Sequence, residues 1–270
     1  MSVRESVRVE FRVDDQPGWT CSRCGKGRLV FSEKSQLRRQ TADSSRDEDE
    51  YPDWEPQNQV DRFAAILTCE DCGDPVAVGG DAHCEDFAAE DQPEDFRMVL
   101  VPTHVSPAPR IVPRPGKLPR DVEGALRRSE GLFWSDEIGC ANAIRSVVEA
   151  VLTDQRVRRF ATAKGRRVRV NLHERILEFG RTRDQPLSKA MLAVKWLGNA
   201  GSHAGGAVLK ADLFDGFDLL EHVLRELYDA RARRMARLAR SITKARGPLS
   251  QRRRRKPAGP PRVRRRPARA

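Results

Sequence analysis

Apolar and polar residues alternate along roughly the first hundred residues with a period of two, which is typical of β-strands. The apolar side of a first predicted strand comes from Val7, Val9, Phe11 and Val13. Further short strands are predicted over residues 29–31, 63–68 and 76–78. Residues 36–59 are polar, acidic and poor in aliphatic side chains, and this composition predicts a mobile loop.

The period of the apolar positions changes from two to between three and four after a proline-rich stretch. Six prolines between residues 101 and 119 predict an extended connector, where we place a domain boundary. Helices are predicted over about 120–131, 136–155, 172–179, 187–197 and 213–227, with Gly180 and Gly198 as helix ends. The last helix could continue through residues 230–246 along a thin apolar stripe. Helices with one apolar face must bury it, so an all-helical bundle is expected.

The fold class expected from these patterns is α+β with segregated domains. Residues 1–100 are assigned to a small β domain with an acidic loop, and residues 101–119 to a connector. Residues 120–245 are assigned to a helical bundle, and residues 246–270 to a disordered basic tail. The sequence lacks a long apolar run, and its first residues are charged. We therefore expect a cytoplasmic protein with no membrane partner.

The net charge of +11 is distributed unevenly along the chain. Residues 1–100 contain 12 basic and 23 acidic side chains, whereas residues 101–245 contain 27 basic and 16 acidic ones. The last 25 residues add 11 basic side chains and no acidic one. A tail of this kind binds polyanions with a strong dependence on salt, so nucleic acid is its expected partner. Its two basic clusters consist of Arg252, Arg253, Arg254, Arg255 and Lys256, and of Arg264, Arg265 and Arg266.

Two Cys-x-x-Cys-Gly motifs are the strongest chemical signal in the sequence. They contain Cys21 and Cys24 in the first motif and Cys69 and Cys72 in the second. Two intervening residues let both thiolates face one ion, and the following glycine allows a tight turn. Four thiolates form a closed tetrahedral shell, which predicts structural zinc; His83 and Cys84 are the alternative ligands.

This first region resembles a zinc ribbon, on the basis of the two cysteine motifs and the short strands around them. Its acidic character would repel phosphates, which favours a structural or protein-contacting role. Cys140 lies instead on the apolar face of a predicted helix, where a small core residue is expected.

The helical region resembles the bacterial domain of unknown function 4145, which is grouped with the HEPN superfamily of RNA-associated helical domains. The resemblance rests on AIRSVVEAVL, NLHERI and KWLGNAGSHAGG, followed by a leucine-rich helix. It implies a homodimer in which paired bundles bring two histidine loops together. HEPN ribonucleases are thought to cleave RNA with an arginine followed, four to six residues later, by a histidine.

The residues that match this motif lack the arginine. If His203 is the histidine, the arginine would occupy a position that here holds glycine, leucine or tryptophan. Lys195 lies one residue outside that window, and Asn199 matches the polar position before the histidine. A lysine lacks the two-pronged donor of arginine, so a structural role is favoured over catalysis. Arg145 could hold a phosphate or pair with Glu149 one turn away.

The interpretation that we favour is a non-catalytic, RNA-associated protein of bacterial defence or regulation. The alternatives are a metal-independent ribonuclease that uses His203, Asn199 and Lys195, and an adaptor that contacts an unknown protein partner.

Overall fold

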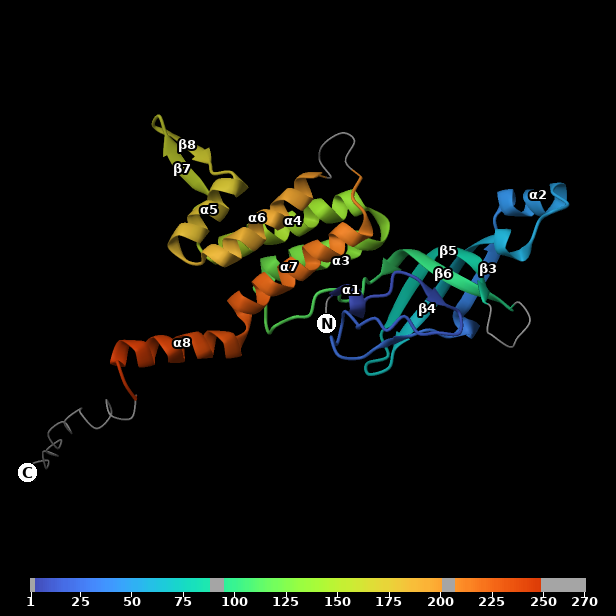
Figure 1. The fold of residues 1–270 in the computed structure, drawn as a ribbon, viewed down its shortest axis with the longest axis horizontal. Coiled ribbons are helices and arrows are strands. Elements are labelled where there is room, and N and C mark those ends of the chain that lie inside the picture. Colours follow the sequence, from blue (N-terminus) through green and yellow to red (C-terminus); the bar gives the residue numbers. More distant parts are fainter. Residues whose placement is uncertain (1–2, 88–94, 201–206, 249–270) are drawn as a thin grey trace, which may run out of the picture.

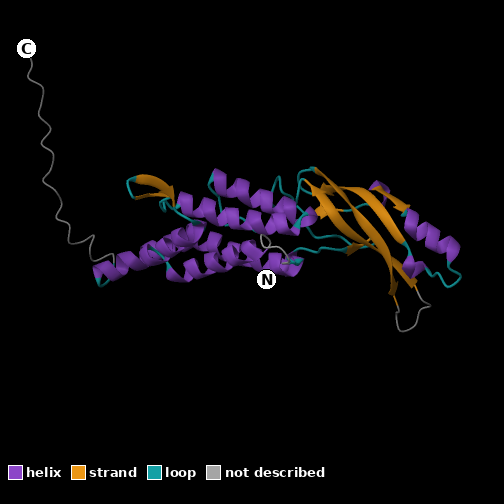
Figure 2. Ribbon diagram, turned by 90° about the horizontal axis from the view of Figure 1, so that it is seen from above, coloured by secondary structure: helices purple, strands orange, loops and turns teal. Residues whose placement is uncertain are grey.

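A computed structural model describes residues 3–87, 95–200 and 207–248 of the chain. A curled antiparallel sheet forms the N-terminal region, and a group of packed helices follows it (Figures 1 and 2). Buried residues of both regions belong to one continuous hydrophobic core. The segregated α+β arrangement expected from the sequence is therefore present, although both halves differ from it in detail. No helix within the described ranges is long and apolar enough to cross a membrane.

The sheet is built around three long adjacent strands, β4, β5 and β6. Its strands are β1 (Phe11–Arg12), β2 (Leu29–Val30), β3 (Gln36–Gln40), β4 (Val60–Cys69), β5 (Pro75–Phe87) and β6 (Asp95–Ser106). They lie in the order β1-β6-β5-β4-β2, and β3 also pairs with β4. Alternate residues of β4 are buried, from Asp61 to Cys69, so the period-two pattern correctly identified a strand with one buried face.

The N-terminal segment differs from the prediction. A short helix, α1 (Val3–Ser6), precedes β1, so Val7 and Val9 lie outside any strand. The predicted strand over 7–13 was therefore wrong except at its centre. Val3 and Val7 are buried, and the Val3 N–H donates to Asp218 Oδ1 at 2.7 Å, which ties this segment to the helical region.

The acidic segment predicted as a mobile loop is ordered. It contains β3, the helix α2 (Ala42–Glu50) and the 3-10 turn η2 (Pro56–Asn58), and another 3-10 turn, η1 (Glu33–Ser35), comes directly before it. Thr41 caps α2 by accepting a hydrogen bond from the Ser44 N–H. The buried Ser44 Oγ accepts from the Val60 N–H at 3.0 Å, so one small polar side chain joins the helix to β4.

The connector is shorter than predicted because β6 continues to Ser106. Beyond that strand the chain is extended, and it packs closely on the helical region. Glu130 Oε1 accepts the backbone N–H groups of Ile111 and Val112, and the Arg114 guanidinium reaches both Glu130 and Glu123. This segment is therefore fixed on both sides.

The helical region follows the predicted helices closely. It contains α3 (Arg120–Ser135), α4 (Glu137–Asp154), α5 (Leu172–Thr182), α6 (Gln185–Ala200), α7 (Lys210–Tyr228) and α8 (Ala230–Ala245). Gly180 and Gly198 do not end their helices, because both lie inside them. The continuation after α7 is a separate helix, since Asp229 has an extended backbone.

The expectation of an all-helical bundle was wrong at one place. A β-hairpin, β7 (Phe160–Ala163) and β8 (Arg166–Arg169), lies between α4 and α5 and projects from the helices (Figure 1). Its two-residue turn consists of Lys164 and Gly165, which both have positive φ angles, 49° and 74°. Two successive positive φ angles are the geometry of a type I′ turn, which matches the twist of a tight hairpin.

Candidate functional site

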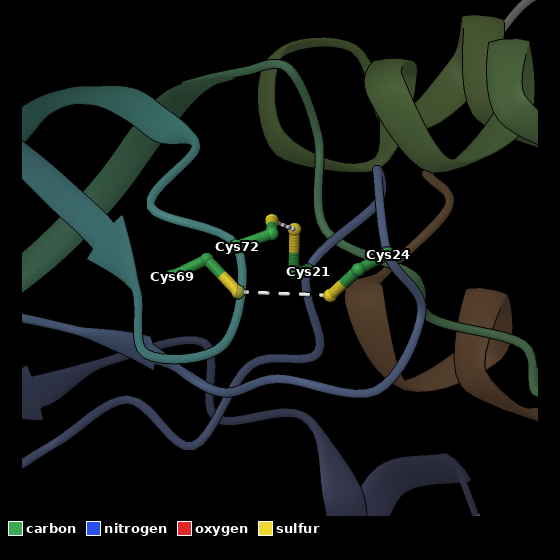
Figure 3. Close-up of side chains that lie close together, drawn as sticks. All are labelled: Cys21, Cys24, Cys69 and Cys72. Carbon is green, nitrogen blue, oxygen red and sulfur yellow. Dashed lines mark hydrogen bonds between the residues drawn. The ribbon is translucent and has the colours of Figure 1, made fainter.

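The structure brings together all four cysteines of the two motifs. Their sulfur atoms lie within 4.8 Å of one another, and no other such metal-ligand cluster of His, Cys, Asp and Glu occurs among the described residues. Cys21 Sγ lies 3.8 Å from Cys72 Sγ, and Cys24 Sγ lies 3.7 Å from Cys69 Sγ (Figure 3). Each close pair therefore contains one cysteine from each motif. The cluster brings together two turns that are far apart in the sequence of the sheet region.

Two similar turns present the sulfurs. Gly25 and Gly73 follow the second cysteine of each motif and have φ angles of 69° and 70°, which glycine adopts without strain. Their N–H groups donate to the carbonyls of Cys21 and Cys69, both at 2.9 Å. Gly27 is required for a different reason, because a Cβ there would lie 2.5 Å from Cys69 Sγ.

The surrounding groups favour ligation at Cys24. The backbone N–H groups of Lys26 and Gly27 lower the pKa of the Cys24 thiol to about 6. Burial raises the pKa of Cys21 above the ordinary thiol value. Because metals bind the thiolate, Cys24 is a ready ligand at neutral pH, and a bound cation would favour deprotonation of Cys21 as well.

The first turn of the cluster also contacts the segment that leads to the helices. The Arg110 guanidinium donates to the Ser22 carbonyl from Nε and Nη2, at 3.3 and 3.2 Å. The Arg110 N–H donates to the Thr20 carbonyl at 3.0 Å. The cluster is therefore positioned between the sheet and the chain segment that enters α3.

The remaining cysteines and His83 lie outside the cluster. His83 is 3.5 Å from the carboxylate of Glu85, and Cys84 lies on β5 near Asp61, so neither alternative ligand is part of the group. Cys140 is fully buried in α4, and its Sγ lies 3.2 Å from the Ser129 carbonyl oxygen. Burial raises its pKa, which confirms the prediction of a small core residue.

The second predicted site is placed only in part. Lys195 and Asn199 lie one turn apart on α6, whereas His203 lies outside the described residues. The helix continues through Gly198, and α6 lies against α4 at this residue. A Cβ at position 198 would be 2.9 Å from both the Ala141 carbonyl oxygen and Arg145 Cβ. The glycine therefore permits close helix packing.

Arg145 forms the ion pair predicted for it. Its guanidinium lies 3.6 Å from Glu149, and Glu149 also pairs with Arg169 of β8 at 3.3 Å. The hairpin is thereby fixed to α4. Sequence reasoning missed Arg169 because no hairpin was predicted there.

An exposed aromatic residue beside Lys195 was also missed. The Trp196 side chain is 59% exposed, with Lys195 Nζ 3.5 Å from its ring centroid and the ring of His173 at 6.3 Å. The signal for it was a tryptophan just outside the apolar stripe of α6.

The tail residues proposed to bind nucleic acid lie outside the described ranges. They are Arg252, Arg253, Arg254, Arg255, Lys256, Arg264, Arg265 and Arg266. Within the described part, basic residues gather on two elements. Residues 156–169 contain seven basic and no acidic side chains, and α8 contains six basic and no acidic ones.

Two family models match this chain. Residues 127–245 match a domain of unknown function (DUF4145), and residues 9–104 match a second domain of unknown function (DUF8608). Comparison with curated proteins and with solved structures found no match. The second match spans the sheet from β1 into β6 and both cysteine motifs. The match of residues 127–245 to DUF4145 confirms the resemblance identified from the sequence.

Proposed function

We propose that this protein is a non-catalytic module that associates with nucleic acid, RNA in particular, and that its sheet region is stabilised by structural zinc. The observation that carries the proposal is the separation of charge. Fourteen residues around the hairpin and the whole of α8 contain basic side chains without a single acidic one. Such segments attract a phosphate backbone independently of its sequence.

Zinc is the metal that the four sulfurs suit best. Tetrahedral zinc with Zn–S bonds of about 2.3 Å requires sulfurs about 3.8 Å apart. The separations of Cys21 from Cys72 and of Cys24 from Cys69, 3.8 and 3.7 Å between sulfurs, fit this value. Four thiolates would fill the shell, so zinc held by Cys21, Cys24, Cys69 and Cys72 would stabilise the fold and leave no position for substrate.

We propose that the protein is not catalytic because of the residues that α6 presents at the position of the ribonuclease motif. Lys195 and Asn199 share one side of the helix, but the arginine of the HEPN ribonuclease motif is replaced. The Lys195 ammonium lies over Trp196 and is a single-point donor, which grips a phosphate less specifically than a guanidinium. The HEPN-like resemblance therefore supports RNA association more than RNA cleavage.

Salt-dependent binding tests the proposal. The intact chain and a chain that ends at residue 248 are titrated against labelled mixed-sequence RNA at several salt concentrations. Removing residues 249–270 eliminates ten basic side chains, so affinity should fall and its salt dependence should become shallower. The proposal is wrong if the intact chain does not bind RNA; unchanged binding by the shorter chain would contradict the role of the tail.

A further inference from the structure

The β7–β8 hairpin is basic, but its basic residues fall into two groups. Near the base, Arg158 pairs with Glu178 of α5 at 2.9 Å, and Arg169 pairs with Glu149 of α4 at 3.3 Å. Towards the turn, Lys164, Arg166 and Arg167 are exposed and have no ion pair among the described residues. The ion pairs at the base hold the arm against two helices, while the far half keeps its positive charge.

A cation–π pair between Phe160 and Arg167 lies on the hairpin surface. Phe160 is 42% exposed, and the Arg167 guanidinium carbon lies 3.8 Å from its ring centroid. The strand register places Phe160 opposite Arg169 and Thr162 opposite Arg167, so these four side chains share one face of the ribbon. An exposed phenylalanine with a guanidinium over its ring is a platform on which a nucleobase can stack.

The turn of the hairpin contains a charged residue, Lys164, at a position whose backbone conformation disfavours lysine. Lys164 has a φ angle of 49°, in the left-handed region that asparagine or glycine adopts more easily in such turns. The lysine places an ammonium at the point of the hairpin farthest from the helices.

We infer that the β7–β8 hairpin is an arm that binds single-stranded RNA, with an unpaired base stacked on Phe160 and Arg167 on one face of the ribbon. The strand then passes over the turn, and its next phosphates pair with Lys164 at the turn and with Arg166 on the opposite face. This inference rests on the proposed function and identifies the part of the helical region that performs it. The positive charge of the hairpin complements the phosphodiester backbone of RNA. The exposed aromatic ring favours a single strand, because the bases of a duplex are already stacked on each other.

The test uses the full chain and fluorescence anisotropy with a labelled single-stranded RNA of mixed sequence, over a range of salt concentrations. Lys164→Gln combined with Arg166→Gln should reduce the slope of log affinity against log salt by about 1.4, since each phosphate contact to a single strand contributes about 0.7. Lys34→Gln combined with Arg39→Gln is the matched control. It removes the same charge from exposed positions of the sheet region and should leave the slope near that of the wild type.

A second variant separates stacking from charge. Phe160→Leu should weaken binding to the single strand about fivefold or more, with an unchanged salt slope and unchanged affinity for a fully paired duplex of the same sequence. In parallel, a 4-thiouridine RNA cross-linked by light should form an adduct on the tryptic peptide of residues 160–164.

The outcomes distinguish this inference from the proposed function. If the wild type binds RNA but the variant with Lys164→Gln and Arg166→Gln behaves like the charge-matched control, the hairpin inference is wrong and RNA association stands. Equal losses for single strand and duplex in Phe160→Leu overturn base stacking, and adducts confined to residues 230–270 overturn the arm. If the wild type binds no RNA, both proposals fail.

Discussion

The rings of Trp19 and Trp134 pack with their centroids 4.6 Å apart. Trp19 precedes Cys21 by two residues, and Trp134 lies in the last turn of α3; both side chains are at most 2% exposed. The Trp19 Nε1 also donates to the Arg8 carbonyl at 2.8 Å. The segment that leads into the cysteine cluster is therefore packed directly on the helical region.

This contact leads to a prediction about metal removal. Purified protein should contain one zinc ion per chain, and Cys69→Ser should lose it, because the sulfur shell would be incomplete. Loss of zinc should lower the melting temperature of the helices as well as that of the sheet, since the Trp19 contact joins them. Metal analysis by mass spectrometry and thermal melting by circular dichroism at 222 nm measure the two effects.

Cys84→Ser is the matched control for the metal prediction. It makes the same chemical change at a cysteine of β5 outside the cluster, so zinc content should remain at one ion per chain. Full zinc retention in Cys69→Ser would contradict the four-cysteine assignment.

Gly198→Ala should destabilise the helical region by about 1–3 kcal/mol, because the added methyl group would lie 2.9 Å from the Ala141 carbonyl oxygen. Gly124→Ala in α3 is a matched control, since a Cβ there meets nothing within 4 Å. The control should be neutral or more stable by up to about 1 kcal/mol, from helix propensity. Urea denaturation of both variants measures the difference, and equal stability would exclude close packing of α6 on α4.

Glu130→Gln should reduce the free energy of unfolding by about 2–3 kcal/mol, because it removes the charge of the more buried of the two carboxylates that pair with the Arg114 side chain. If the amide oxygen keeps the two backbone N–H groups of the connector, the amide nitrogen then faces Arg114 Nη2, which donates to the second carboxylate oxygen in the wild type. Glu226→Gln on the exposed side of α7 provides a control of the same chemistry. A stability change no larger than that of the control would show that the connector is held by other contacts.

Glu123 gives a prediction with a pH dependence. Burial alone would raise its pKa, but hydrogen bonds and charge from Arg114 and Arg127 outweigh burial and lower it. A lowered pKa in the folded state means that this carboxylate stabilises the fold above its ordinary pKa, near 4.3, and loses that contribution as the pH falls further. Glu123→Gln should therefore be less stable than the wild type by about 1–2 kcal/mol at pH 7.

The difference in the free energy of unfolding between Glu123→Gln and the wild type should shrink as the pH is lowered from about 4.5 to 3. In this range Glu123 becomes protonated and, like glutamine, carries no charge. Denaturation at pH 7, 5 and 3.5 follows the difference directly. A gap that stays constant over this range would mean that the Glu123 charge does not contribute.

The last prediction concerns catalysis. Full-length protein incubated with end-labelled RNA in excess EDTA should leave the RNA intact on a denaturing gel, because the arginine of the ribonuclease motif is missing. Cleavage that disappears in His203→Ala but persists in His104→Ala would instead establish a metal-independent ribonuclease.

The features predicted well from sequence are those with a strong periodic or spacing signal. The α4 stripe predicted a helix over 136–155, and the structure has one at Glu137–Asp154. The cysteine spacing predicted four residues that the fold brings together across 51 positions of sequence, between Cys21 and Cys72. Both patterns are local consequences of how helices and tight turns place side chains.

The features missed are those stabilised by single contacts. In α2 the sequence is almost entirely polar, and the helix depends on the Thr41 cap and on one buried serine. The hairpin strands have four residues each, and β8 contains a single apolar residue, so they give no clear alternation. Its main signal was the Lys164-Gly165 pair, which departs from the asparagine-glycine sequence common in such turns.

The hydrogen bond between Val3 and Asp218 joins residues 215 positions apart. During synthesis, α1 emerges from the ribosome long before α7 exists, so its partner surface is missing for most of translation. The sheet and the early helices can form contacts of their own in that interval, but α1 must wait for nearly the whole ordered chain. A chain interrupted before α7 would consequently leave two apolar side chains, Val3 and Val7, exposed to chaperones and proteases.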